Sequence, residues 1–255
     1  MLSFFRKKSQ KPEIALSPVM PDRLLYAVGD IHGRADLLEQ MIDAIEIDAA
    51  GAEGDLVFLG DYIDRGPESA AVLRRLCGLR VGHLRVNCLM GNHEQMLLSF
   101  LEDPLAGEMW LRNGGMETIS DFDPARRDPA EGVSPLQDLR DRLQRAMGQE
   151  LVDWLRGLPL SFLSGTAGCV HGMADPKASW EMQAARGVLW GRPTAASTPR
   201  RDGIWVIHGH TVVPQAEIGP GRIAVDTGAY KSGLLSAVRC DGGESRFLTV
   251  GGAAQ

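Results

Sequence analysis

Cysteines, aromatic residues and long apolar runs are scarce in this chain of 255 residues. The four cysteines are Cys77, Cys88, Cys169 and Cys240. They form no C-x-x-C pair, so we expect reduced thiols in a cytoplasmic protein rather than disulfides or a zinc site. No stretch approaches the roughly 18 consecutive apolar residues that a bilayer span needs, which predicts a soluble protein without a membrane partner. The excess of acidic over basic residues, 33 against 27, argues against nucleic acid as the main partner.

The beginning of the chain shows no pattern of a folded element. Leu2, Phe4 and Phe5 precede a group of basic residues, which is the reverse of the order in a signal peptide. We expect a flexible N-terminal tail over residues 1–20 and a single domain over residues 21–255. The composition, 44% hydrophobic and 24% charged, is that of a globular chain with a sizeable core.

Three units of a strand followed by a helix make up the first part of the expected domain. Apolar runs at Leu24–Val28, Leu56–Leu59 and Leu84–Met90 each end in a glycine and a polar residue. A pattern of helical periodicity follows each run. Because strand, helix and connections repeat about every 30 residues, we predict parallel strands joined by right-handed crossovers.

The remainder of the chain contains a helical segment and then further strands. Residues 103–160 are mostly polar, with one long amphipathic helix expected from Leu136 to Leu155, and we interpret them as a cap inserted into the domain. After Ser161, short apolar runs alternate with glycine-rich turns, which predicts hairpins and antiparallel pairing. The expected fold class is therefore α/β, a layered α-β-β-α sandwich with mixed sheets.

Side chains that can bind metal ions follow each of the first three apolar runs directly. Asp30 and His32 follow the first run, Asp61 the second, and Asn92 and His93 the third. In open α/β sheets, ligands bind at the edge formed by the carboxyl ends of the strands. Adjacent parallel strands lie about 4.8 Å apart, so we expect these side chains to converge at that edge.

Two later histidines, His171 and His210, also follow apolar runs and extend this set of oxygen and nitrogen donors. Such donors suit manganese, iron or zinc better than a soft-metal centre. The set is too large for one catalytic ion with open positions, and it fits two ions that share a bridging carboxylate. Two ions of this kind can hold the attacking and leaving oxygens of a displacement at phosphorus.

Five short motifs contain these residues, in a fixed order along the chain. They are Gly29-Asp30-Ile31-His32-Gly33, Gly60-Asp61-Tyr62-Ile63-Asp64-Arg65-Gly66, Gly91-Asn92-His93-Glu94, Val170-His171-Gly172 and Gly209-His210-Thr211. Content and order resemble the phosphoprotein phosphatase branch of the calcineurin-like metallophosphoesterases, and in particular its bacterial serine/threonine protein phosphatases. The resemblance extends from about residue 24 to residue 228. Met90 departs from it, because many relatives have an arginine at this position.

The resemblance implies a centre of two divalent metal ions, with manganese expected and iron or zinc as alternatives. The implied ligands of the first ion are Asp30, His32 and Asp61. Those of the second ion are Asp61, Asn92, His171 and His210, so that Asp61 bridges the two ions. Water activated by the ions would attack phosphorus directly, without a covalent phosphoenzyme.

The resemblance also implies roles for residues beside the ions. His93 corresponds to the general acid that protonates the leaving alkoxide, and Asp64 to the carboxylate that orients this imidazole. Arg65 corresponds to an arginine that binds the phosphate through its planar guanidinium, with Arg192 expected as a second such arginine and Asn92 as a further phosphate contact.

The expected activity is that of a metal-dependent phosphomonoester hydrolase whose substrate is a phosphoprotein or a small phosphorylated molecule. Serine/threonine phosphoproteins are the preferred substrate, and hydrolysis of diadenosine tetraphosphate on the same metal core is the alternative. A nucleotide enzyme needs aromatic or arginine planes for the base, and the cap offers only Trp110, Phe122 and Trp154, which is weak evidence for protein substrates.

Two further questions stay open at the level of the sequence. A protein that only binds phosphorylated partners would be expected to lack a metal ligand or the acid, and neither is missing here. His208 lies two residues from His210, and we interpret it as packing within a strand or as a hydrogen-bond partner of the metal site.

Overall fold

The three predicted strand-helix units form one half of the computed structural model, which describes residues 17–123, 134–194 and 198–252. The strands are β1 (Leu24–Val28), β2 (Gly54–Phe58) and β3 (Leu84–Cys88). The helices that follow them are α1 (Ala35–Ala49), α2 (Ser69–Leu76) and α3 (Asn92–Glu102). Strand β1 pairs in parallel with β2, and β2 pairs in parallel with β3, as the periodicity predicts.

Two mixed sheets result, each of five strands in the described part of the chain. The first sheet has the order β10-β9-β1-β2-β3. Strand β9 (Leu234–Cys240) pairs antiparallel with both β1 and β10 (Arg246–Gly251). The second sheet has the order β4-β5-β6-β8-β7. Its strands are β4 (Ser161–Ser164), β5 (Ala167–Val170), β6 (Trp205–His208), β7 (Glu217–Gly219) and β8 (Arg222–Ala224).

The expectation of antiparallel pairing throughout the later strands is wrong for the centre of the second sheet. Strand β6 pairs in parallel with both β5 and β8. The connection from β5 to β6 contains a 3₁₀ turn (Trp180–Met182) and helix α8 (Ala185–Trp190), so it is long enough to return the chain to the same end of the sheet. The outer pairs of this sheet, β4 with β5 and β7 with β8, are expected hairpins, and so is the pair β9 with β10 in the first sheet.

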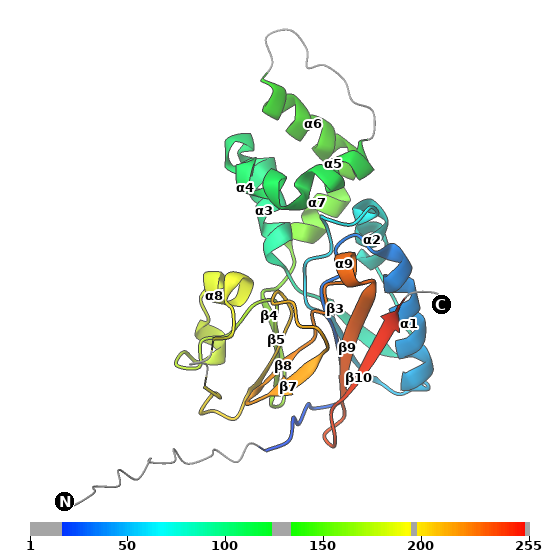
Figure 1. Cartoon of the computed structure of the whole chain (residues 1–255), viewed down its shortest axis with the longest axis vertical. Helices are drawn as coiled ribbons and strands as arrows, with labels where there is room; N and C mark the ends of the chain where they lie inside the picture. Colours follow the sequence, from blue (N-terminus) through cyan, green and yellow to red (C-terminus); the bar gives the residue numbers. More distant parts are fainter. Residues whose placement is uncertain (1–16, 124–133, 195–197, 253–255) are drawn as a thin grey trace, which may run out of the picture.

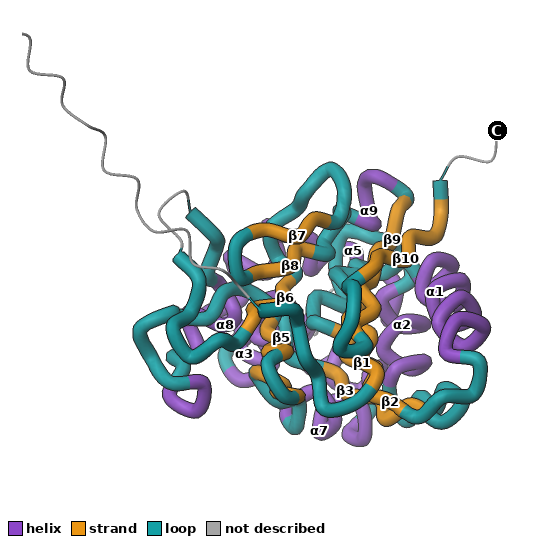
Figure 2. Tube along the Cα trace, turned by 90° about the horizontal axis from the view of Figure 1, so that it is seen from below, coloured by secondary structure: helices purple, strands orange, loops and turns teal. Residues whose placement is uncertain are grey.

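The two sheets pack face to face between helices, as the predicted sandwich requires (Figures 1 and 2). Leu25 and Ala27 of β1 meet Cys169 and Ile207 of the second sheet in a buried apolar layer. Their neighbours Tyr26 and Val28 face α1 and α2 instead, because successive side chains of a strand point to opposite faces. Helix α8 packs on the outer face of the second sheet. The α/β fold with mixed sheets is therefore confirmed.

The segment between α3 and β4 forms helices that extend from one end of the sandwich (Figure 1). They are a 3₁₀ turn (Pro104–Gly107), α4 (Glu108–Trp110), a π-helical turn (Leu111–Gly115), α5 (Met116–Phe122), α6 (Pro135–Met147) and α7 (Gln149–Arg156). We call this segment the cap. One continuous helix from Leu136 to Leu155 is wrong, because Gly148 has φ 81° and separates α6 from α7.

Part of the predicted tail contacts the second sheet. The indole N–H of Trp205 donates to the carbonyl of Ser17 at 2.9 Å, the backbone N–H of Met20 donates to the hydroxyl of Thr166 at 2.8 Å, and Val19 is buried. Contacts with the sandwich therefore begin before residue 21, whereas residues 1–16 lie outside the described residues.

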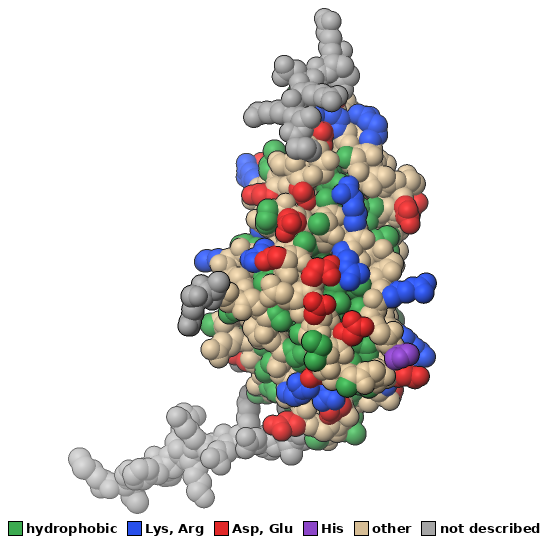
Figure 3. Space-filling view, turned by 90° about the vertical axis from the view of Figure 1, so that its right-hand side faces the viewer, with side chains coloured by type: hydrophobic (Ala, Val, Ile, Leu, Met, Phe, Trp, Pro, Cys, Tyr) green, Lys and Arg blue, Asp and Glu red, His purple; other side chains and the backbone are tan. Residues whose placement is uncertain are grey.

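The surface and the thiols agree with the composition. In the described parts of the chain, no helix combines the length and apolarity of a membrane span. All four cysteines are free thiols, as expected. On the face that Figure 3 shows, acidic and basic side chains are interspersed rather than gathered by sign.

Candidate metal centre

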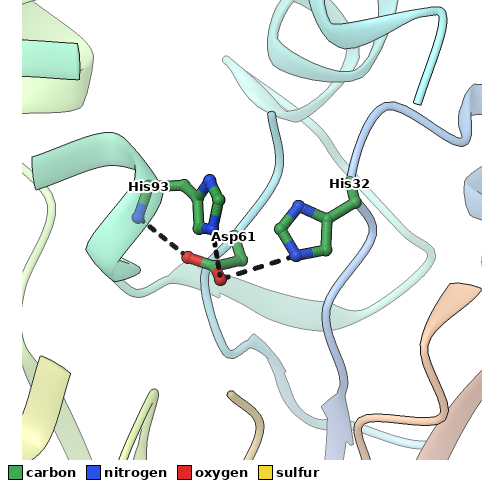
Figure 4. A group of neighbouring side chains, drawn as sticks. All are labelled: His32, Asp61 and His93. Carbon is green, nitrogen blue, oxygen red and sulfur yellow. Dashed lines mark hydrogen bonds and ion pairs between the residues drawn. The ribbon is translucent and has the colours of Figure 1, made fainter. Parts of the chain in front are cut away.

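The carboxylate of Asp61 lies between two groups of imidazoles. Its Oδ2 is 3.6 Å from Nε2 of His32 and 3.8 Å from Nε2 of His93, and its Oδ1 is 3.3 Å from Nε2 of His171. Figure 4 shows His32 and His93 on either side of this carboxylate. Donor atoms of Asp61, His171 and His210 all lie within 4.8 Å of one another, and so do those of His32, Asp61 and His93. Imidazoles from the other four motifs thus meet at the carboxylate of the second motif.

The loops that present these side chains have an unusual backbone. Five of the six non-glycine residues with positive φ in the described chain lie in these loops: His32 at 46°, Asp61 at 53°, Asp64 at 73°, Arg65 at 68° and His210 at 60°; the sixth is Ala50 at the end of α1. Such conformations cost about 1–3 kcal/mol each and persist where the surrounding structure enforces them, commonly at functional sites. The local strain therefore coincides with the predicted site.

A close approach of backbone segments explains two of the motif glycines. A Cβ atom at Gly91 would lie 2.2 Å from Oδ1 of Asp61, and one at Gly209 would lie 2.1 Å from Oδ1 of Asp30. Any larger residue at either position would displace a carboxylate of the site.

Glu94, the last residue of the third motif, joins the second and third loops. Its buried carboxylate accepts backbone N–H bonds from Asp61 at 2.9 Å, Tyr62 at 2.8 Å and Gly91 at 2.9 Å. Burial, and then the neighbouring Asp61 carboxylate, raise the pKa of Glu94 to about 7. The Glu94 side chain therefore holds the Asp61 loop in place.

Two imidazoles are oriented with one nitrogen toward Asp61. The Nδ1 of His32 lies 2.7 Å from the carbonyl of Ile63, and the Nδ1 of His171 lies 3.1 Å from the carbonyl of Leu59. A carbonyl only accepts, and the Nε2 of His32 accepts an N–H of the Arg65 guanidinium, so in His32 the Nδ1 carries the proton and Nε2 offers a lone pair. Burial lowers the pKa of His32 to about 3, which favours the neutral form that binds metal ions.

Asp30 and Asn92 lie beside these groups. A carboxylate oxygen of Asp30 accepts the backbone N–H of His210 at 3.1 Å, although Asp30 belongs to neither group of donor atoms. The amide oxygen of Asn92 is 2.8 Å from Nε2 of His171. Burial, and then Asp226 and Asp61, raise the pKa of Asp30 well above its usual range.

The donor set fits divalent cations. Asp30, Asp61 and Asp226 are buried, and among the described residues none of the three forms an ion pair with lysine or arginine. Buried carboxylates that repel one another need positive charge close by. Together with imidazoles whose lone pairs face the same space, these carboxylates form a site with the donors that two such ions require.

A second arrangement connects His93 to the cap. The Nδ1 of His93 lies 2.6 Å from Oδ2 of Asp64. The same carboxylate accepts the indole N–H of Trp110 at 2.9 Å and the hydroxyl of Thr118 at 2.6 Å. Burial lowers the pKa of His93, but Asp61 and Asp64 outweigh it, so that the pKa is raised. In His93, therefore, Nε2 faces Asp61, and Nδ1 on the other side of the ring contacts the Asp64 carboxylate.

The two predicted phosphate-binding arginines lie at opposite sides of the site. The guanidinium of Arg65 bonds to Nε2 of His32 at 2.9 Å and to Nε2 of His93 at 3.0 Å. It also lies over the ring of Tyr230 in α9 (Ala229–Ser232), 4.9 Å from the ring centroid. The Nε of Arg192 lies 3.5 Å from Nε2 of His210. Both arginines are therefore within reach of the space between the imidazoles.

The sequence model of the family described as calcineurin-like phosphoesterase matches residues 24–214. The chain belongs to this family.

Several relatives of this calcineurin-like phosphoesterase are named bis(5'-nucleosyl)-tetraphosphatase. A symmetrical bis(5'-nucleosyl)-tetraphosphatase of Acidovorax sp. (strain JS42) is 35% identical over 137 residues, 54% of this chain and 38% of the relative. One of Legionella pneumophila (strain Corby) is 30% identical over 169 residues, 66% of this chain and 49% of the relative. The chain thus spans less than half the length of these relatives. The asymmetrical bis(5'-nucleosyl)-tetraphosphatase PrpE of Halalkalibacterium halodurans is 25% identical over 241 residues, 88% of this chain and 92% of the relative.

Solved structures show the same fold. A putative diadenosine tetraphosphatase has a TM-score of 0.60 with 20% identity, covering 94% of this chain and 100% of its own. A protein serine/threonine phosphatase from Saccharomyces cerevisiae has a TM-score of 0.58 with 17% identity, covering 94% of this chain and 85% of its own.

Sequence reasoning about this phosphoesterase missed four residues at the site. Trp110 and Thr118 lie in the expected cap, where the sequence gives them no role at the metal site, and neither Tyr230 nor Asp226 is singled out by the sequence. The one signal for Asp226 is its place directly after an apolar run. His208 is buried in β6 with Nδ1 3.0 Å from the carbonyl of Gly209, and it belongs to neither donor group.

Proposed function

We propose that this chain is a metal-dependent hydrolase that cleaves dinucleoside tetraphosphates. The observation that carries the proposal is the Asp61 carboxylate, which lies between His32 and His93 on one side and His171 and His210 on the other. The names of the relatives support a dinucleotide substrate, the alternative in the sequence analysis, better than the phosphoprotein preferred there. The likeness to a protein phosphatase is one of fold, at 17% identity.

Two divalent ions would be held by the carboxylates, imidazoles and amide around Asp61. The proposed ligands are Asp30, His32, Asp61, Asn92, His171 and His210. Bound ions, manganese in this proposal, would supply Lewis acidity toward a phosphoryl oxygen and make water more acidic. Leu59 and Ile63 orient two of the imidazoles through their carbonyls, and Glu94 holds the loop of the shared carboxylate.

The remaining side chains would bind the phosphate and move a proton. Arg65 and Arg192, with the amide of Asn92, would donate hydrogen bonds to phosphoryl oxygens. His93 would give a proton from Nε2 to the leaving oxygen as that bond breaks, once the Arg65 guanidinium, which donates to this nitrogen at 3.0 Å, donates to the phosphate instead. Asp64, 2.6 Å from Nδ1, stabilises the protonated imidazole before transfer.

Parallel assays of the purified chain test the substrate. Metal-free protein supplied with manganese, iron or zinc is given diadenosine tetraphosphate, a phosphoserine peptide and p-nitrophenyl phosphate. We expect the highest kcat/KM for the dinucleotide. A higher value for the phosphopeptide would refute the proposed substrate, and metal binding without hydrolysis of any of the three would support a protein that only binds phosphorylated partners.

Two substitutions test the assigned roles. Asp61→Asn is expected to lower the bound metal, measured by mass spectrometry of the elements, together with activity. His93→Asn is expected to keep the metal and to lose about 10²–10⁴ in turnover, the range for general acid catalysis. His83→Asn, at an exposed histidine outside the motifs, is the matched control. Full metal content in Asp61→Asn, or full turnover in His93→Asn, contradicts the corresponding role.

A further inference from the structure

A groove lies beside the metal centre, between α3 and α4 on one side and α8 on the other. Its volume is about 510 Å³, and its lining includes Gln95, Met96, Ser99, Met109, Arg186 and Trp190. This volume is within the range of pockets that bind small ligands. We call it the Trp190 groove.

Trp190 belongs both to the groove and to the surroundings of the metal centre. Its indole ring lies 6.3 Å from the His210 ring, at an interplanar angle of 79°. Its Nε1 donates to the amide oxygen of Gln95 at 2.8 Å. Because an indole N–H only donates, this bond fixes the orientation of the Gln95 amide and leaves its NH₂ group to donate elsewhere. The groove is therefore one side chain away from the imidazoles, with a hydrogen-bond donor of defined orientation.

The lining has the chemistry of a nucleotide site. Trp190 offers an aromatic plane, and the thioethers of Met96 and Met109 offer polarisable apolar surface that adapts to a flat ring. Arg186 is exposed, and it forms no ion pair with any residue in the described ranges. A flat heterocycle attached to negatively charged phosphates complements this combination of an apolar slot and a free positive charge.

The three aromatic residues of the cap do not line this groove. Trp110 is fully buried and Phe122 is 8% exposed. Trp154 packs against Tyr62 with ring centroids 6.2 Å apart. The sparse aromatics of the cap therefore say nothing against a nucleotide substrate, because the ring that lines the groove belongs to α8.

We propose that the Trp190 groove binds the nucleobase of a nucleotide substrate, with the base against the Trp190 indole and Arg186 beside the adjoining phosphates. The assignment of the substrate class rests on the proposed function, whereas binding of the base in this groove can be measured without turnover.

Calorimetric titration of the manganese-loaded full chain tests the proposal. The two probes are α,β-methylene-ADP and methylenediphosphonate, which share a bridged diphosphonate group and differ by the nucleoside. We expect the nucleoside to tighten binding about tenfold, within the range for base stacking on an aromatic ring. Met109→Asp should reduce this advantage, because it places a negative charge on the groove wall where the base binds. Arg186→Gln should weaken the binding of both probes, because it removes the positive charge beside the group that they share.

A control separates the groove from general effects of the substitution. Met20→Asp changes a methionine that is 48% exposed, compared with 52% for Met109, and that lies outside the groove, so the advantage should stay at its original value. Equal affinity of the two probes in the unaltered chain, an undiminished advantage in Met109→Asp, or unweakened binding of both probes to Arg186→Gln overturns the proposal. If the advantage behaves as expected but diadenosine tetraphosphate is not cleaved, the proposed function fails and the nucleotide site stands.

Discussion

Replacing Trp110 by phenylalanine tests whether the cap positions the proposed general acid. The indole N–H of Trp110 donates to Asp64 at 2.9 Å, and Asp64 in turn is 2.6 Å from Nδ1 of His93. Phenylalanine retains an aromatic ring at this buried position, and it removes the N–H donor together with part of the indole ring. The Asp64 carboxylate keeps the hydroxyl of Thr118, so we expect weakened rather than abolished orientation of His93.

The size of the effect follows from the burial of Asp64. Its side chain has no exposed surface, and burial raises the pKa of this carboxyl. The hydrogen bonds that the carboxylate accepts oppose this effect, because each of them stabilises the charged form. A hydrogen bond to a buried charged group contributes about 1.5–3 kcal/mol. At about 1.4 kcal/mol for each factor of ten, complete loss of that contribution from the transition state would slow turnover about 10- to 100-fold. We expect about tenfold, because Thr118 remains.

A series of leaving groups distinguishes positioning of the acid from damage to the fold. Phenyl phosphate needs a proton on its leaving oxygen, whereas 2,4-dinitrophenyl phosphate scarcely does. Trp110→Phe should therefore lower kcat about tenfold for the first and less than about twofold for the second, with unchanged metal content. Phe100 packs against Trp110 with ring centroids 5.1 Å apart, so Phe100→Leu is a matched packing control without loss of a hydrogen bond. Equal losses on both substrates in Trp110→Phe would refute the reasoning.

Three further predictions concern stability and reactivity. Gly114→Ala should lower the free energy of unfolding, measured by chemical denaturation, by about 1–3 kcal/mol, because Gly114 has φ 112° and a Cβ there would lie 2.7 Å from the backbone nitrogen of Arg65. Gly148→Ala, at φ 81° with open space around the new Cβ, should lose less, and the reverse order would contradict the steric argument. Burial raises the pKa of the Cys88 thiol to about 12, so iodoacetamide at pH 8 should modify it much more slowly in the native than in the urea-unfolded chain, and equal rates would be the opposing result. Removal of divalent ions with a chelator should lower Tm, since about 4 kcal/mol is lost where the ion had been present at 1,000 times its Kd; superimposable melting curves with and without the chelator would speak against a metal centre.

The N-terminal strands and the convergence of the donor residues were predictable from the sequence. Leu24–Val28 and the two apolar runs after it differ sharply from the polar loops that follow, and this contrast is local. Parallel strands with connections of similar length bring their carboxyl ends to one edge. For this reason, Asp61 and the imidazoles around it could be expected to meet before any coordinates were known.

The later strands and the cap depended on properties that the local pattern does not carry. Parallel pairing of β6 with β5 and β8 depends on the path of the long connections between them, which periodicity does not reveal. The single helix expected from Leu136 to Leu155 satisfied its apolar periodicity, and only the positive φ at Gly148 divides it. Short strands such as β7, with 3 residues, give too weak an alternation to be recognised.

The sequence by itself determined which residues have the chemistry for metal binding and phosphoryl transfer, because side-chain type and order along the chain are properties of the sequence. Only the tertiary structure decided which other side chains surround them. Trp110 lies 46 residues from Asp64 along the chain and still donates to its carboxylate, and Trp190 lies 95 residues from Gln95, with which it forms the wall of the groove. Such contacts result from the packing of the cap and α8 around the sandwich. This packing depends on contacts between segments that are distant along the chain, which no local pattern in the sequence contains.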